Sequence, residues 1–176
     1  MKKIIILLIL LFNSYIVSSQ STIVTKQKYL TLLNMPDTAF ISILDSIIDI
    51  EKNCSYYSEA LCFSISVDKI GRYFDIDKQR HTNISNGLGI YVESCESIDI
   101  LLDTFKDKYG YFYHKNHLFV VFNNFAKEVF TKTEQKKKIV YKYITNRLMI
   151  FDDSKSNWTY CYDKGNYVLM EKYICE

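Results

Sequence analysis

The spacing of apolar residues along the chain predicts two helices. Over residues 37–52 they recur every three or four positions, and polar residues occupy the opposite face. Pro36 cannot extend a helix backwards, and the side chain of Asp37 can cap the free amides of the first turn. A second apolar stripe, followed by Gly110 as a C-terminal stop, predicts a helix over residues 97–108.

Most of the remaining chain alternates between apolar and polar residues, as strands with one buried face do. The clearest predicted strand covers residues 61–68, and others are predicted at 72–76, 138–144 and 148–151. Two hairpins are predicted as well, one pairing residues 109–113 with 118–122 and the other pairing 158–162 with 167–174. The segment 125–138 stays open between helix and strand.

These elements predict an α+β fold in which two helices pack on one face of a mainly antiparallel, meandering β-sheet. No repeat, linker or low-complexity tract divides the chain, so residues 20–176 are expected to form a single globular domain.

Residues 1–19 have the pattern of a removable export signal. Lys2 and Lys3 precede nine consecutive apolar residues at 4–12, and small residues follow at Ser18 and Ser19. As a helix the apolar run reaches about 14 Å, half of the hydrocarbon core of a bilayer, which disfavours the alternative of an uncleaved anchor. We therefore expect a secreted or periplasmic protein that begins at Gln20 and has no membrane span after cleavage.

Charge then narrows the class of partner. The chain has 22 Lys+Arg and 20 Asp+Glu, and the two lysines of the signal account for the whole excess. A neutral mature chain argues against nucleic acid as a partner, because affinity for phosphates rests on an excess of Lys and Arg. The run Lys136, Lys137 and Lys138 is accordingly interpreted as a solvated turn.

Five cysteines follow the signal, at Cys54, Cys62, Cys95, Cys161 and Cys175. Export would allow disulfides among them, and two bridges with one leftover thiol can be arranged in about fifteen ways. Cys161–Cys175 is disfavoured because a regular final hairpin would separate the two by over ~20 Å. Cys54–Cys62 is weakly favoured. Cys95 lies just before the second predicted helix. It is either a reactive thiol or the site of an intermolecular bridge, or else an ordinary disulfide partner or a buried apolar group, and this last pair of interpretations is favoured.

The sequence contains few side chains in patterns that indicate catalysis or metal binding. His114 and His117 flank a two-residue turn, so they form a weak candidate pair for a metal, a pH-sensitive pair, or polar turn residues. No hydrolase signature, zinc-protease motif or phosphate-binding loop occurs, so no cofactor is predicted and catalysis is disfavoured.

Aromatic residues are the remaining signal. Alternation predicts one row formed by Tyr109, Tyr111 and Tyr113 and a second row formed by Trp158, Tyr160 and Tyr162. Exposed rows would suit a protein or carbohydrate partner, whereas buried rows would simply fill the core, and the core is the favoured interpretation. The expected function is a non-catalytic binding or interaction module. The alternatives are a secreted hydrolase of unknown substrate and a self-associating envelope or structural component.

Overall fold

A computed structural model describes residues 22–69, 87–95, 97–103, 107–144 and 156–174. Within these residues the chain forms eight strands, two α-helices and one short 3-10 helix. In chain order the elements are β1 (Ile23–Asn34), α2 (Thr38–Glu51), β2 (Cys62–Lys69), β3 (Leu88–Cys95), α3 (Ile98–Asp103), β4 (Lys108–His114), β5 (His117–Phe122), η1 (Asn124–Glu128), β6 (Thr131–Ile144), β7 (Asn157–Asp163) and β8 (Asn166–Tyr173).

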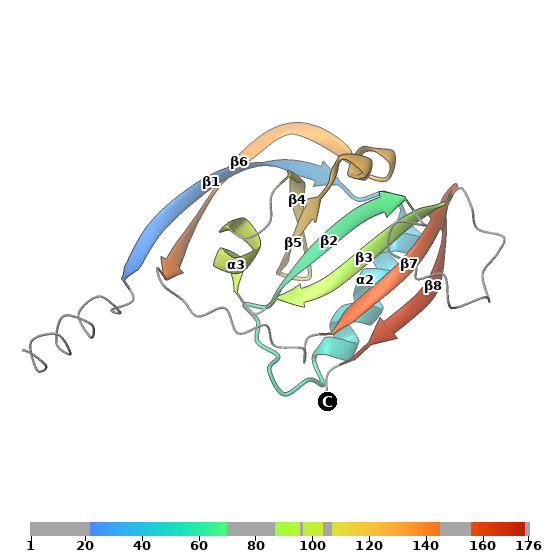
Figure 1. The fold of residues 1–176 in the computed structure, drawn as a ribbon, viewed down its shortest axis with the longest axis horizontal. Coiled ribbons are helices and arrows are strands. Elements are labelled where there is room, and N and C mark those ends of the chain that lie inside the picture. Colours follow the sequence, from blue (N-terminus) through green and yellow to red (C-terminus); the bar gives the residue numbers. More distant parts are fainter. Residues whose placement is uncertain (1–21, 70–86, 96, 104–106, 145–155, 175–176) are drawn as a thin grey trace, which may run out of the picture.

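All eight strands belong to one mixed sheet, in the order β6-β1-β4-β5-β2-β3-β7-β8. The β4–β5 hairpin lies between β1 and β2, so that β1 pairs in parallel with β4 and β2 pairs in parallel with β5. The predicted antiparallel meander is therefore wrong. Alternation identifies a strand but does not identify its neighbour, and here a later hairpin separates two earlier strands (Figure 1).

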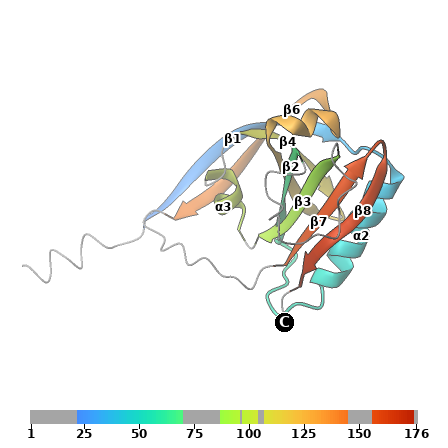
Figure 2. The same ribbon diagram turned by 45° about the vertical axis from the view of Figure 1, so that its right-hand side comes forward.

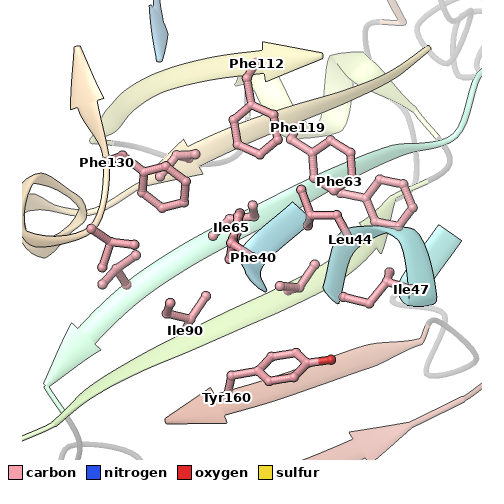
Figure 3. Close-up of a cluster of buried hydrophobic side chains, with 14 of the residues drawn as sticks. Phe40, Leu44, Ile47, Phe63, Ile65, Ile90, Phe112, Phe119, Phe130 and Tyr160 are labelled. Carbon is pink, nitrogen blue, oxygen red and sulfur yellow. The ribbon is translucent and has the colours of Figure 1, made fainter. Parts of the chain in front are cut away.

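The two helices cover opposite faces of the sheet, which also corrects the prediction that they share one face. Residues of α2 pack against Phe63, Ile65 and Phe119 in one core cluster (Figure 3). Leu101 of α3 packs in a second cluster that includes Val120 on the opposite face. Every residue of β5 is buried, so this central strand is apolar on both sides and both of its faces need a cover.

Both predicted helices exist. The carboxylate of Asp37 caps α2 and accepts a hydrogen bond from the backbone N–H of Phe40 at 2.8 Å. α3 begins at Ile98 and is described as far as Asp103. Gly110, expected as its C-terminal stop, lies instead within β4. None of the described helices is long and apolar enough to cross a membrane.

Both predicted hairpins are confirmed. The turn between β4 and β5 has φ values of 45° and 67° at Lys115 and Asn116. The turn between β7 and β8 has φ values of 48° and 87° at Lys164 and Gly165. Two successive residues with positive φ are the mark of a type I′ turn, whose twist matches that of the flanking strands.

The other strand predictions divide into three groups. The strand predicted at 61–68 is β2, and the one predicted at 138–144 is the second half of β6. The open segment 125–138 contains η1 and the start of β6. The strands predicted at 72–76 and 148–151, and the signal at 1–19, lie outside the described residues. β1 and β3 were not predicted.

Candidate binding surface

β1 and β6 form a long two-stranded ribbon, called the ribbon below. They pair antiparallel from Ile23 opposite Ile144 to Asn34 opposite Thr131. β1 meets β4 at a single register position, Leu32 opposite Tyr111, so the N-terminal half of β1 pairs with β6 alone. This half of the ribbon projects from the rest of the sheet, as both ribbon views show (Figures 1 and 2).

The inner face of the ribbon is fixed to α3. Ile139 and Tyr141 are buried in the second core cluster beside α3. Asp103 at the end of α3 accepts a hydrogen bond from the Tyr141 hydroxyl at 3.0 Å and forms an ion pair with Lys26 at 3.0 Å. Burial and the nearby Asp103 carboxylate raise the pKa of Tyr141, so its hydroxyl stays protonated as a donor. Because these contacts cover the inner face, the opposite face of the ribbon is directed toward solvent.

The outer face of the ribbon is exposed and combines lysines with a few apolar groups. Directly opposed residues share a face of an antiparallel pair, and the outer pairs include Tyr29 with Lys138 and Gln27 with Val140. The Tyr29 side chain is 64% exposed and Val140 is 58% exposed. The exposed outer face consists of Ile23, Thr25, Gln27, Tyr29, Lys136, Lys138, Val140 and Lys142.

The ribbon is strongly basic. β1 and β6 together contain seven lysines and one acidic residue, Glu134, which gives a formal charge of +6. Lys136, Lys137 and Lys138 lie inside β6, so their interpretation as a turn is wrong. Burial lowers the pKa of Lys108 in neighbouring β4, and the positive charge of Lys28 on the ribbon lowers it further. The neutral total charge of the expected mature chain therefore conceals a local excess of cations.

Some of these lysines are engaged by tyrosine rings, and others are not. The Lys137 ammonium lies 4.9 Å from the centroid of the Tyr113 ring, and that of Lys26 lies 3.4 Å from the centroid of Tyr143. Within the described residues, no ion pair or ring contact engages Lys136, Lys138 or Lys142. These three outer lysines lie within seven consecutive residues of β6, so the first and the last are about 20 Å apart along the strand, and their charges are available to a partner.

The predicted row of Tyr109, Tyr111 and Tyr113 does not form a common surface. A register shift between Lys108 and Gly110 turns Tyr109 to the α2 side of the sheet, where its hydroxyl donates to the carbonyl of Phe130. Tyr111 is buried in the second cluster, and burial raises its pKa. Tyr113 alone is exposed, at 45%. The alternation rule fails here because a bulge adds one residue to the strand.

Trp158, Tyr160 and Tyr162 do share a face, but that face is the core. Trp158 and Tyr160 are buried against the α2 layer, and Tyr162 is partly buried beside them. Burial also raises the pKa of Tyr160. Figure 3 shows the Tyr160 ring directed into the cluster with Ile90. The row thus acts as core rather than as a surface, in line with the favoured interpretation of the sequence.

His114 and His117 lie opposite each other across the β4–β5 turn, as the spacing predicts. His114 Nε2 lies 2.6 Å from an Asp45 carboxylate oxygen, which also accepts from Lys115. These contacts, with Lys115 contributing most, lower the pKa of Asp45. His117 is buried, with Nδ1 2.9 Å from the Leu61 carbonyl and Nε2 3.3 Å from the Tyr57 hydroxyl. A carbonyl only accepts, so Nδ1 carries a proton and donates it to the Leu61 carbonyl.

The His117 nitrogens are thus both engaged by protein groups. Among the described residues, no group of three or more His, Cys, Asp or Glu side chains could hold a metal ion. His81, the third histidine of the chain, lies outside the described residues. His114 thus connects the β4–β5 hairpin to α2 through Asp45, and His117 connects it to the segment that follows α2 through Tyr57 and Leu61.

The favoured Cys54–Cys62 bridge is wrong. Cys54 is disulfide-bonded, and none of the other three described cysteines is its partner. Cys62 and Cys95 lie opposite each other on β2 and β3, and both are buried, which removes the exposure that a reactive Cys95 requires. Cys161 is a buried thiol opposite Val168, as the predicted final hairpin required. Cys175 lies outside the described residues.

A buried polar cluster that the sequence did not reveal joins the end of α2 to β3. The Tyr56 hydroxyl donates to the fully buried Glu51 carboxyl at 2.7 Å and lies 3.0 Å from the Ser94 hydroxyl and 3.2 Å from that of Ser156. Burial raises the pKa of Tyr56. Because Glu51 is fully buried, we interpret this cluster as an internal hydrogen-bonded connection between the end of α2 and β3 rather than as a surface site. No local spacing could have indicated it, since its members span about a hundred residues.

Comparison with protein-family models, curated proteins and solved structures finds no match for this chain.

Proposed function

We propose that this is an exported, non-catalytic binding protein that uses the outer face of the ribbon to hold an acidic polysaccharide. The single observation that carries the proposal is the set of exposed lysines on that face, Lys136, Lys138 and Lys142, on a ribbon with a formal charge of +6. Cations gathered on one surface create a local potential that attracts anions even when the whole protein is neutral.

The chemistry of the lysines favours a polysaccharide over a folded protein. Lysine is depleted in the centres of protein–protein interfaces, where aromatic residues, methionine and arginine are enriched. A lysine ammonium is a compact point charge that does not need the planar geometry an arginine requires. It can therefore meet sulfate or carboxylate groups repeated along a flexible polymer. Tyr29, exposed among these lysines, offers an amphipathic ring to a sugar face.

Export is part of the proposal. It rests on the order of residue types in residues 1–19, where two lysines are followed by an apolar run and then by small residues. It would separate the protein from cytoplasmic nucleic acid, the other abundant polyanion. N-terminal sequencing of the natural protein should begin at Gln20. A sequence beginning at Met1 would contradict export while leaving the basic surface unchanged.

Heparin, a sulfated polysaccharide, is the probe that tests the surface. We expect the triple variant Lys136→Gln, Lys138→Gln and Lys142→Gln to bind heparin roughly 10- to 100-fold more weakly at low salt, because each lysine near an anionic surface contributes about 1 kcal/mol. Titration calorimetry at two salt concentrations measures the affinity. The wild-type affinity should fall steeply with salt, and that of the variant less steeply.

A matched variant controls for total charge. Lys52, Lys127 and Lys164 are exposed and lie outside the ribbon, so their replacement by Gln should leave the affinity within about twofold, given the short range of screened charges. Equal losses in the two triple variants would contradict a localised site. Tighter binding to polyglutamate than to heparin would point to an acidic protein partner instead.

Sedimentation of the same samples tests a structural explanation for the lysines. β6 is an edge strand, and lysines on an edge strand can prevent pairing with another sheet. If the ribbon variant self-associates yet binds heparin as the wild type does, the lysines protect an edge and the proposed binding function is wrong.

A further inference from the structure

We propose that Cys62 and Cys95 form a cross-strand disulfide when the protein folds in an oxidising compartment. The two residues are direct partners in the antiparallel pairing of β2 and β3. Directly opposed residues of an antiparallel pair have Cα atoms about 4.5–5.5 Å apart, and disulfides bridge Cα separations of about 4.4–6.8 Å. The register alone therefore brings the two side chains within bridging reach.

Both side chains also point to the same side of the sheet and into the same surroundings. Cys62 is 2% exposed, Cys95 is 5% exposed, and both belong to the core cluster that contains Leu101 and Leu102 of α3. Cys62 Sγ donates a hydrogen bond to the Cys95 carbonyl at 3.1 Å, and Cys95 Sγ donates to the Ser97 carbonyl at 3.4 Å. The structure thus holds them as neighbouring thiols in an apolar layer.

The reaction is thiol–disulfide exchange with a small-molecule disulfide such as oxidised glutathione. The thiolate of one cysteine attacks the glutathione disulfide and releases one reduced glutathione. The second cysteine then attacks the resulting mixed disulfide, forms the S–S bond between Cys62 and Cys95, and releases the second reduced glutathione. The two cysteines are oxidised, and one glutathione disulfide is reduced to two thiols. Because both cysteines are buried, the exchange belongs to folding rather than to the native state.

The bridge would stabilise the part of the molecule that supports the binding surface. It lies at the start of β2 and the end of β3, immediately before α3 (Figure 1). Asp103 at the end of α3 holds Lys26 and Tyr141 of the ribbon. A covalent link beneath α3 therefore restricts the element on which the ribbon rests. Only the cellular occurrence of the bridge depends on the proposed export, because the pairing itself follows from the register.

The test is refolding of the full chain from denaturant with oxidised and reduced glutathione, followed by alkylation without reduction. Trypsin leaves Cys54 and Cys62 in one peptide, since no lysine or arginine lies between them. Chymotrypsin is added to cut after Tyr56 or Tyr57 and so to separate the two cysteines. Mass spectrometry should then find the Cys62 peptide linked to the Cys95 peptide. Linkage of Cys62 to Cys54 or Cys161, or alkylation of both Cys62 and Cys95, would overturn the proposal.

Thermal unfolding provides a second readout. The bridge closes a loop of about 33 residues, for which chain-entropy arguments predict a contribution of about 10 °C to the melting temperature. Dithiothreitol also reduces the disulfide of Cys54, so the readout is the part of the difference between oxidised and dithiothreitol-refolded protein that depends on Cys95. Cys95→Ala should reduce that difference by about 10 °C, whereas Cys161→Ala should leave it unchanged. In vitro refolding does not require export, so a negative result here is distinguishable from a failure of the N-terminal sequencing test.

Discussion

Replacement of Phe119 by Ala is expected to lower the free energy of unfolding by about 3–5 kcal/mol, the largest effect of any single substitution considered. Phe119 is fully buried in the central strand β5. Its ring stacks on Phe63 at a centroid distance of 4.6 Å and on Phe112 at 5.1 Å. Removing it leaves a cavity between two rings that come from different strands, so neither neighbour can fill the space without moving its backbone. Urea denaturation followed by far-UV circular dichroism measures the change.

Two control variants are expected to lose less stability than Phe119→Ala. Phe119→Leu keeps most of the volume and should cost less than about 1.5 kcal/mol. Tyr29→Ala removes a ring that is 64% exposed on the ribbon and should change stability by less than about 0.5 kcal/mol. If Phe119→Ala proved no more destabilising than Tyr29→Ala, the arrangement of strands around β5 would be incorrect.

Gly110→Ala is expected to destabilise the protein by about 2 kcal/mol, in the range that overpacking costs. A Cβ atom at this position would lie 2.6 Å from a methyl carbon of Leu33 and 2.7 Å from the backbone carbonyl oxygen of Thr31. Both neighbours belong to β1, so the substitution forces β1 away from β4 where the ribbon joins the sheet. The unfolding midpoint in urea measures the loss of stability.

Gly89→Ala is the matched control, since it also replaces a strand glycine. There the three heavy atoms nearest to the added Cβ, at 2.7–2.9 Å, all belong to the outer end of the Tyr91 side chain and none to the backbone, so a shift of one side chain relieves the contact. We expect it to cost less than half as much as Gly110→Ala. Equal costs would show that the loss reflects the glycine itself rather than the close approach of β1 to β4.

Local elements could be predicted from the sequence because the residues that determine them are neighbours in the chain. The cap at Asp37, the apolar stripe of α2 and the two-residue turn at Lys115 and Asn116 each depend on a few consecutive positions. The order of the strands depends instead on contacts between distant residues. The close approach of Gly110 to β1 is one such contact, and periodicity carries no information about it.

The candidate binding surface was missed for a related reason. The N-terminal half of β1 is exposed on nearly all of its residues, so it lacks the alternation that identifies a strand with one buried face. The neutral total charge favours a solvated turn at Lys136–Lys138, but it does not reveal that seven lysines meet on two paired strands. The uneven distribution of charge emerges only when β1 and β6 are placed side by side. The same holds for Cys62 and Cys95, which become neighbours through the register of β2 and β3.

Lysine footprinting tests the central claim most directly. The wild-type protein would be acetylated briefly with and without saturating heparin, and the modification of each lysine would be quantified by mass spectrometry. We expect heparin to reduce acetylation several-fold at Lys136, Lys138 and Lys142 and to leave Lys52, Lys127 and Lys164 unchanged, because only the first three lie on the outer face of the ribbon. Equal protection at all six lysines, or protection confined to the second three, would contradict the assignment of the ribbon as the binding surface.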